Sequence, residues 1–149
     1  MSNRLVLSPR LALVDTGAYF ALSDTKESRH PLARTVFERL TKERWRLYTT
    51  NFIIAETHAL LLNRLGYQVA LRFMERVDSS STTIIRVTED DERRAREIIR
   101  QYNDKKFSLT DATSFVVMAR LGIPYAFTFD RNFTQYGLIV LTPEHFSQR

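Results

Sequence analysis

Short apolar runs alternate along the chain with longer stretches whose apolar residues recur every three to four positions. The short runs predict buried strands at residues 11–14, 46–49, 83–87, 125–129 and 138–141. The longer stretches predict helices at 17–22, 31–40, 51–66, 67–77, 89–102 and 112–121. Strands that alternate with helices are typical of an α/β fold with a central parallel sheet. No linker or repeat interrupts the pattern, so we expect a single domain over residues 1–149.

Residues that favour helix ends support these boundaries. Asn51 is a candidate N-cap for the helix at 51–66, and Gly66 is suited to end it in a left-handed conformation. Ser108 and Asp111 have the spacing of a capping box before the helix that follows. Asp111 therefore has a structural explanation as well as a chemical one.

Four carboxylates stand where an apolar segment stops or a helix begins: Asp15, Glu56, Asp111 and Asp130. Asp15 closes the first predicted strand, and Asp130 closes the strand at 125–129. Glu56 and Asp111 lie in the first turns of their helices. Because parallel sheets gather ligand-binding residues at the carboxyl ends of their strands, one edge of the sheet could collect all four.

The residue types indicate which chemistry such a site could perform. The chain has no cysteine and three histidines, so a metal bound here would have oxygen ligands, which favours Mg²⁺ or Mn²⁺. Two such ions about 3.5 to 4 Å apart can stabilise the attacking and leaving oxygens of a phosphodiester. Each acid could instead begin a turn or favour a helix N-terminus, but the coincidence of four favours the metal site.

The net charge of +5, with a pI near 9.8, contrasts with these acids. A basic surface around an acidic pocket suits a polyanion such as RNA. Lys105 and Lys106 precede the helix of Asp111, and Arg131 follows Asp130, so all three could contact phosphates. An ordinary solvated turn would account for the two lysines equally well, and somewhat less well for Arg131.

Two threonines could support the acidic ligands. Thr128 lies two residues before Asp130, so on a strand it would face the same side and could hold that carboxylate or a water on the metal. Thr16 directly follows Asp15 and could play a similar role. An ordinary β-branched strand residue would also explain Thr128.

The segments LALVDTGAYFAL, TTNFIIAETHALL, FSLTDATSFVVMARLGI and AFTFDRNFTQYGL resemble PIN-domain ribonucleases, and most closely the VapC type of toxin–antitoxin pairs. The resemblance covers about residues 11–141, which we take as the core of the domain. It implies a sheet of order 3-2-1-4-5 and an Mg²⁺- or Mn²⁺-dependent endoribonuclease. Asp15, Glu56, Asp111 and Asp130 match the catalytic, metal-binding quartet. A small antitoxin and a homodimer are also implied. The chain departs from many toxins at Asn132, where they carry histidine.

Two other function classes can be weighed against an RNA-cleaving enzyme. A catalytically silent PIN-like module that binds RNA or protein is one, and the intact quartet argues against it. A phosphoaspartate enzyme is the other, but Asp15-Thr16-Gly17 lacks the D-x-D arrangement of that chemistry. Pro9, Arg10 and Asp15 interrupt the apolar N-terminal segment, and no run is long enough for a membrane span, so we expect a cytoplasmic protein.

Overall fold

The structure is a computed structural model, and it describes residues 9–147. Five parallel strands form one sheet in the order β3-β2-β1-β4-β5. The strands are β1 (Leu11–Val14), β2 (Arg46–Thr50), β3 (Thr83–Ile85), β4 (Tyr125–Phe127) and β5 (Ile139–Val140). The predicted α/β class and strand order are therefore confirmed. β1 lies at the centre of the sheet, and the strand order reverses beside it, which is where ligands bind in folds of this kind.

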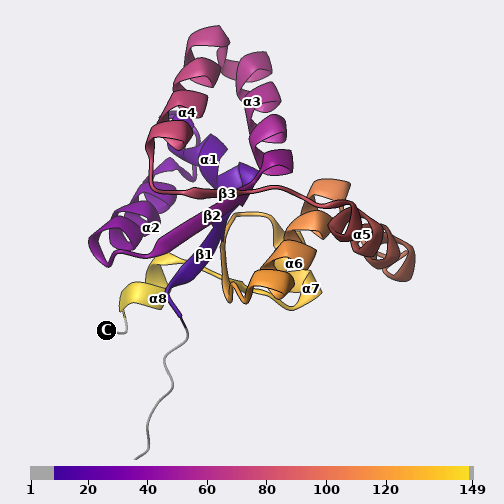
Figure 1. The fold of residues 1–149 in the computed structure, drawn as a ribbon. Coiled ribbons are helices and arrows are strands. Elements are labelled where there is room, and N and C mark those ends of the chain that lie inside the picture. The colour runs from indigo at the N-terminus through magenta and orange to yellow at the C-terminus, as the bar shows by residue number, and fades with distance from the viewer. Residues whose placement is uncertain (1–8, 148–149) are drawn as a thin grey trace, which may run out of the picture.

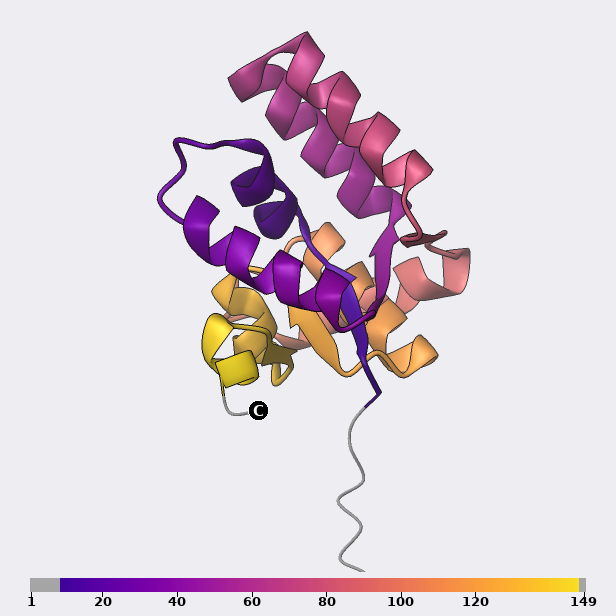
Figure 2. The same cartoon turned by 90° about the vertical axis from the view of Figure 1, so that its left-hand side faces the viewer.

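Helices cover both faces of the sheet (Figure 1). They are α1 (Thr16–Ser23), α2 (His30–Lys42), α3 (Asn51–Leu65), α4 (Tyr67–Ser79), α5 (Glu89–Gln101), α6 (Leu109–Leu121), α7 (Arg131–Tyr136) and α8 (Pro143–Ser147). α3 and α4 form a hairpin that projects away from the sheet (Figure 2). Within residues 9–147, none of the helices is long and apolar enough to cross a membrane.

Alternate residues of β1 build the two halves of the core. Ala12 and Val14 pack with α1, α2 and α8, whereas Leu13 packs with α6, α7 and the start of α3. Successive side chains of a strand point to opposite faces, so a central strand covered on both sides reads as an unbroken apolar run. This is why β1 could be recognised from its sequence, and why the change from Val14 to Asp15 marks its end.

Several boundaries differ from the sequence prediction. The N-cap of α3 is Thr50, whose Oγ1 accepts the Ile53 N–H, and the proposed cap Asn51 is the first residue of the helix. Asn51 Oδ1 instead accepts the Val87 N–H at 2.8 Å and holds the segment after β3. β4 ends at Phe127, two residues early, and the short helices α7 and α8 were not expected. The capping box at Ser108 is confirmed.

Candidate active site

Asp15 lies at the carboxyl end of β1 and is only 3% exposed. Its backbone N–H donates to the carbonyl of Phe127 on β4 at 3.0 Å. Its carboxylate oxygen Oδ2 accepts a hydrogen bond of 2.8 Å from Thr128 Oγ1. The carboxylate is therefore held at the junction of β1 and β4.

Thr128 also ties Asp15 to the next acid. Its Oγ1 accepts the backbone N–H of Asp130 at 3.0 Å. Thr128 thus bonds the side chain of Asp15 and the main chain of Asp130, whereas the sequence suggested that it holds either the Asp130 carboxylate or a water on the metal. That carboxylate caps α7 instead, because Asp130 Oδ1 accepts the Asn132 N–H at 2.9 Å.

Asp111 takes part in the capping box of α6 and also lies at the same edge of the sheet. Its Oδ2 accepts the Ser108 N–H at 3.0 Å, while its own N–H donates to Ser108 Oγ, also at 3.0 Å. Asn132 Nδ2 donates to the same Oδ2 at 2.9 Å. No N–H of residues 9–147 is found bonded to the other oxygen, Oδ1, so capping leaves half of the carboxylate for chemistry.

The acids interact electrostatically with one another. Burial raises the pKa of Asp15 to about 7, and the charges of Asp111 and Asp130 act in the same direction against hydrogen bonds from Thr128 and the Thr16 backbone. Burial likewise raises the pKa of Asp130, and a hydrogen bond with Asp111 and the charge of Glu56 add to the rise. The structure therefore brings Asp15, Asp111 and Asp130 together at the carboxyl edge of the sheet, and Glu56 on α3, which is exposed, is near enough for its charge to act on Asp130.

The residue types in this cluster fit a hard divalent cation. In the described part of the chain, none of the four acids forms an ion pair with arginine or lysine. Thr16 Oγ1 is buried beside Asp15 without a hydrogen-bond partner, which leaves one more oxygen uncommitted. Carboxylate and hydroxyl oxygens are the ligands that Mg²⁺ and Mn²⁺ prefer. Within residues 9–147, however, no group of three or more acidic or histidine side chains is already spaced to hold a metal ion.

Residues 12–138 match the PIN domain family. The chain belongs to the PIN-domain family. A 23S rRNA-specific endonuclease of Mycobacterium tuberculosis, VapC20, is 31% identical over 134 residues, which cover 90% of this chain and 100% of that protein. A VapC ribonuclease of Archaeoglobus fulgidus is 34% identical over 113 residues, which cover 74% of this chain and 71% of that protein.

Solved structures agree with this assignment. The crystal structure of Mycobacterium tuberculosis VapC20, described as a sarcin–ricin loop cleaving toxin, matches with a TM-score of 0.81 over 89% of this chain and 99% of that chain, at 31% identity. FitAcB from Neisseria gonorrhoeae matches with a TM-score of 0.64 over 91% of this chain and 99% of that chain; at 16% identity it shows the fold alone. The interpretation as a PIN-domain ribonuclease toxin of the VapC type is confirmed, and the silent binding module is disfavoured.

The basic residues expected beside the site of this PIN-domain ribonuclease have different surroundings. Lys105 is paired with Asp104 at 2.9 Å. Lys106 is exposed, and its carbonyl accepts a bond of 3.1 Å from Asn132 Nδ2, which places its backbone next to Asp111. Arg131 is exposed at the first position of α7.

Asn132 is the residue whose part in the site the sequence did not reveal. It contacts two of the acids, through its side chain and through its backbone N–H. The spacing of Asp130 and Asn132 could have predicted the backbone contact, because an N-cap aspartate commonly accepts the N–H of the residue two positions later. The spacing could not have predicted the bond from the Asn132 side chain to Asp111.

Proposed function

We propose that this PIN-domain ribonuclease hydrolyses RNA phosphodiester bonds with Mg²⁺ or Mn²⁺ held by the acidic cluster. The ligands would be Asp15, Glu56, Asp111 and Asp130. The observation that carries the proposal is that these acids from four separate segments interact at the carboxyl edge of the sheet with no arginine or lysine paired to them among the described residues. Carboxylates concentrated in this way are suited to bind a cation rather than to support the fold.

The residues of the chain would divide the work of catalysis. Bound cations would supply Lewis-acid stabilisation of the negative charge that develops on the phosphate oxygens. Thr128 holds the Asp15 carboxylate in place, and the Ser108 N–H does the same for Asp111. Glu56, the exposed acid, would orient the attacking water and accept its proton as the water oxygen bonds to phosphorus. The P–O ester bond breaks, and the leaving oxygen takes a proton from solvent.

Similarity to VapC20 suggests the RNA to test first. That relative is named for 23S rRNA and its structure for the sarcin–ricin loop. We infer that this chain also acts on a structured rRNA loop. Lys106 and Arg131 are exposed beside the acids and would contact phosphates on either side of the scissile one, whereas Lys105 would have to leave Asp104 to do so.

A toxin also needs a partner that restrains it. We propose a small antitoxin protein in this role and a homodimer as the assembly of the enzyme, with both acting in the cytoplasm.

Cleavage of an end-labelled RNA hairpin with the sarcin–ricin loop sequence tests the activity and its metal requirement together. We expect cleavage with Mg²⁺ or Mn²⁺, none in EDTA, and none by Asp15→Asn or Asp111→Asn, because an amide is a poor ligand for a hard cation. Glu38→Gln is the matched control, since Glu38 is an exposed carboxylate paired with Arg34 on α2. Circular dichroism checks folding. Undiminished cleavage by both aspartate variants in EDTA would exclude the metal mechanism.

A further inference from the structure

Asn132 connects two acids of the cluster to each other and to the loop before α6. Its backbone N–H donates to Asp130 Oδ1 at 2.9 Å. Its side-chain Nδ2 donates to Asp111 Oδ2 at 2.9 Å and to the carbonyl oxygen of Lys106 at 3.1 Å. The residue is only partly exposed, at the start of α7. The two contacts made by Nδ2 depend on the side chain, and the third is made by the backbone.

The chemistry around the side chain fixes its orientation. A carboxamide carries two N–H donors on nitrogen, and both acceptors that face Nδ2 are oxygens that cannot donate. A flipped amide would place its own oxygen against these two oxygens, so only one orientation satisfies the site. The side chain therefore acts as a donor with no alternative arrangement.

This donation selects which oxygen of Asp111 remains available. Oδ2 receives two donors, the Ser108 N–H and Asn132 Nδ2, and two bonds to one oxygen restrain rotation of the carboxylate. The second oxygen, Oδ1, is left without an N–H donor from the described residues. Asp130 is restrained in a similar way, since its Oδ1 is occupied by the Asn132 N–H.

We propose that Asn132 is a positioning residue of the metal site, which holds the carboxylates of Asp111 and Asp130 so that one oxygen of each is presented to the cation. The inference rests on the proposed function, because it requires that these acids bind a metal. Hydrogen bonds from residues behind the ligands orient them, and their loss typically weakens metal affinity by about 10- to 100-fold.

Binding of Mn²⁺, measured without RNA, tests this role independently of cleavage. Electron paramagnetic resonance of free Mn²⁺ during a titration gives the dissociation constant. We expect Asn132→Leu, which keeps the backbone N–H but removes the side-chain donor, to weaken Mn²⁺ binding by about 10- to 100-fold. Asn132→His should stay within about threefold of wild type, because histidine Nδ1 stands as many bonds from Cα as Nδ2 does and can donate.

Thr134→Val is the matched control. Thr134 Oγ1 donates to the Arg131 carbonyl at 2.9 Å within the same short helix and contacts none of the acids. This variant loses a hydrogen bond of α7 and should bind Mn²⁺ as wild type does. Circular dichroism and the melting temperature check that each variant is folded. If Asn132→Leu does not fold, Asn132→Ala replaces it with the same expectation, since a smaller side chain adds no strain.

The outcomes separate this inference from the proposed function. Wild-type protein that binds Mn²⁺ and cleaves RNA, together with an Asn132→Leu variant of equal Mn²⁺ affinity, overturns the positioning role alone. Equal weakening in Thr134→Val also overturns it, because general loosening of α7 would then explain the loss. Wild-type protein that cleaves RNA in EDTA and does not bind Mn²⁺ overturns both proposals.

Discussion

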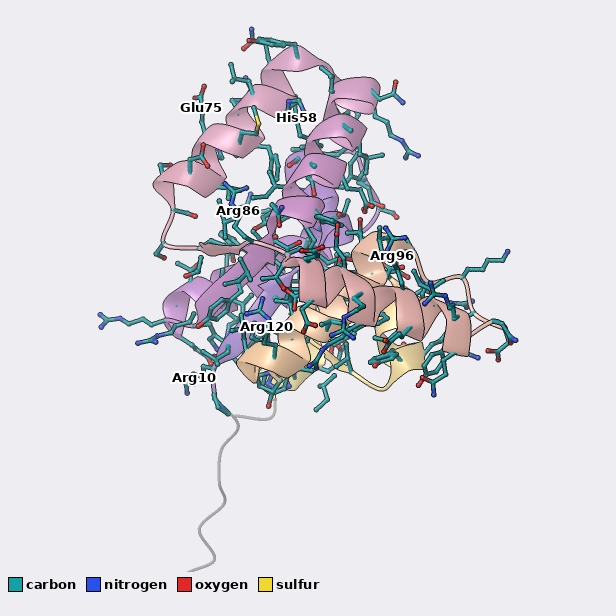
Figure 3. The ribbon with its side chains drawn as sticks, turned by 45° about the vertical axis from the view of Figure 1, so that its right-hand side comes forward. Arg10, His58, Glu75, Arg86, Arg96 and Arg120 are labelled. Atoms are coloured by element: carbon teal, nitrogen blue, oxygen red, sulfur yellow. The ribbon has the colours of Figure 1, made fainter. Side chains whose placement is uncertain are left out.

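The ion pair between Asp91 of α5 and Arg120 of α6 joins the two helices at the end of α6 opposite to Asp111. Figure 3 labels Arg120. Arg120 Nε and Nη2 donate to Asp91 Oδ1 and Oδ2 at 2.9 and 2.8 Å. The Asp91 side chain is 1% exposed, and its Oδ2 also accepts the Thr88 N–H at 3.0 Å. Replacing Arg120 with methionine keeps much of the apolar stem but leaves a buried carboxylate with only its helix-capping bonds.

The expected cost of Arg120→Met follows from this geometry. Removing one partner of a fully buried pair costs about 3–5 kcal/mol. The Arg120 side chain is 39% exposed and Thr88 still bonds Asp91, so we expect the free energy of unfolding to fall by about 2 kcal/mol. In a chain of 149 residues this lowers Tm by about 4–8 °C. Arg93→Met is the control, because Arg93 is 64% exposed and surface pairs of this kind contribute little to stability.

The contribution of the pair should depend on pH. Burial alone would raise the pKa of Asp91, but hydrogen bonds from Arg120 and Thr88 outweigh it and hold that pKa below its ordinary value. A carboxyl group with a lowered pKa in the folded state stabilises the fold above the unfolded value of about 3.9 and loses this effect as pH falls through the folded value. The difference between wild type and Arg120→Met should therefore be complete at pH 7 and shrink below about pH 4.

Urea unfolding followed by far-ultraviolet circular dichroism measures these differences at pH 7 and in steps down to about pH 3. The reasoning is refuted if Arg120→Met destabilises no more than Arg93→Met at pH 7. It is also refuted if the gap between wild type and Arg120→Met stays constant as the pH falls. Either result would mean that water or the helix cap satisfies Asp91 without the guanidinium.

Two further predictions concern the cell and the RNA. Expression of the wild-type chain alone should arrest bacterial growth. Glu56→Gln at matched abundance should relieve the arrest, since an amide cannot accept the proton of the attacking water. Equal arrest by both proteins would indicate RNA or protein binding without cleavage, or a nonspecific burden of expression. In metal-free Asp111→Asn protein, alanine at Lys105, Lys106 or Arg131 should weaken binding alike across RNA sequences and lower the salt slope by a little under about one unit per lost phosphate contact. Fluorescence anisotropy over a salt series measures this, and a triple variant with unaltered affinity and slope would place the RNA on another face.

The position of Asp15 at the carboxyl edge of the sheet could be predicted because the signals for it lie in neighbouring residues of the sequence. A central parallel strand is an unbroken apolar run, so the place where β1 stops and Asp15 begins is visible in the sequence. The end of β4 was less visible. Phe127, Thr128 and Phe129 continue the apolar and β-branched run, but the strand stops at Phe127. Thr128 uses its side chain to bond Asp15 and the Asp130 backbone instead, and that depends on a partner 113 residues away.

Hydrogen bonds between residues far apart in the sequence account for most of the other differences between the prediction and the structure. Thr50 and Asn51 are both good N-caps, and sequence alone gives no reason to choose Thr50. The choice becomes clear only with the bond from the Val87 N–H to Asn51, across 36 positions. The contact between Asn132 and Asp111 spans 21 positions and was missed for the same reason. α7, with six residues, is too short to show helical periodicity.

The two explanations considered for Asp111, helix cap or catalytic ligand, do not exclude each other in this fold. A carboxylate has two oxygens, and at Asp111 the helix N-terminus and Asn132 occupy Oδ2 while Oδ1 keeps no such donor within the described residues. Asp130 follows the same principle, since Oδ1 caps α7. Capping leaves one carboxylate oxygen available and holds the carboxylate through backbone N–H groups, which every substitution except one to proline keeps. A cap placed at the carboxyl edge of a parallel sheet is therefore a reason to look for a ligand there, not an argument against one.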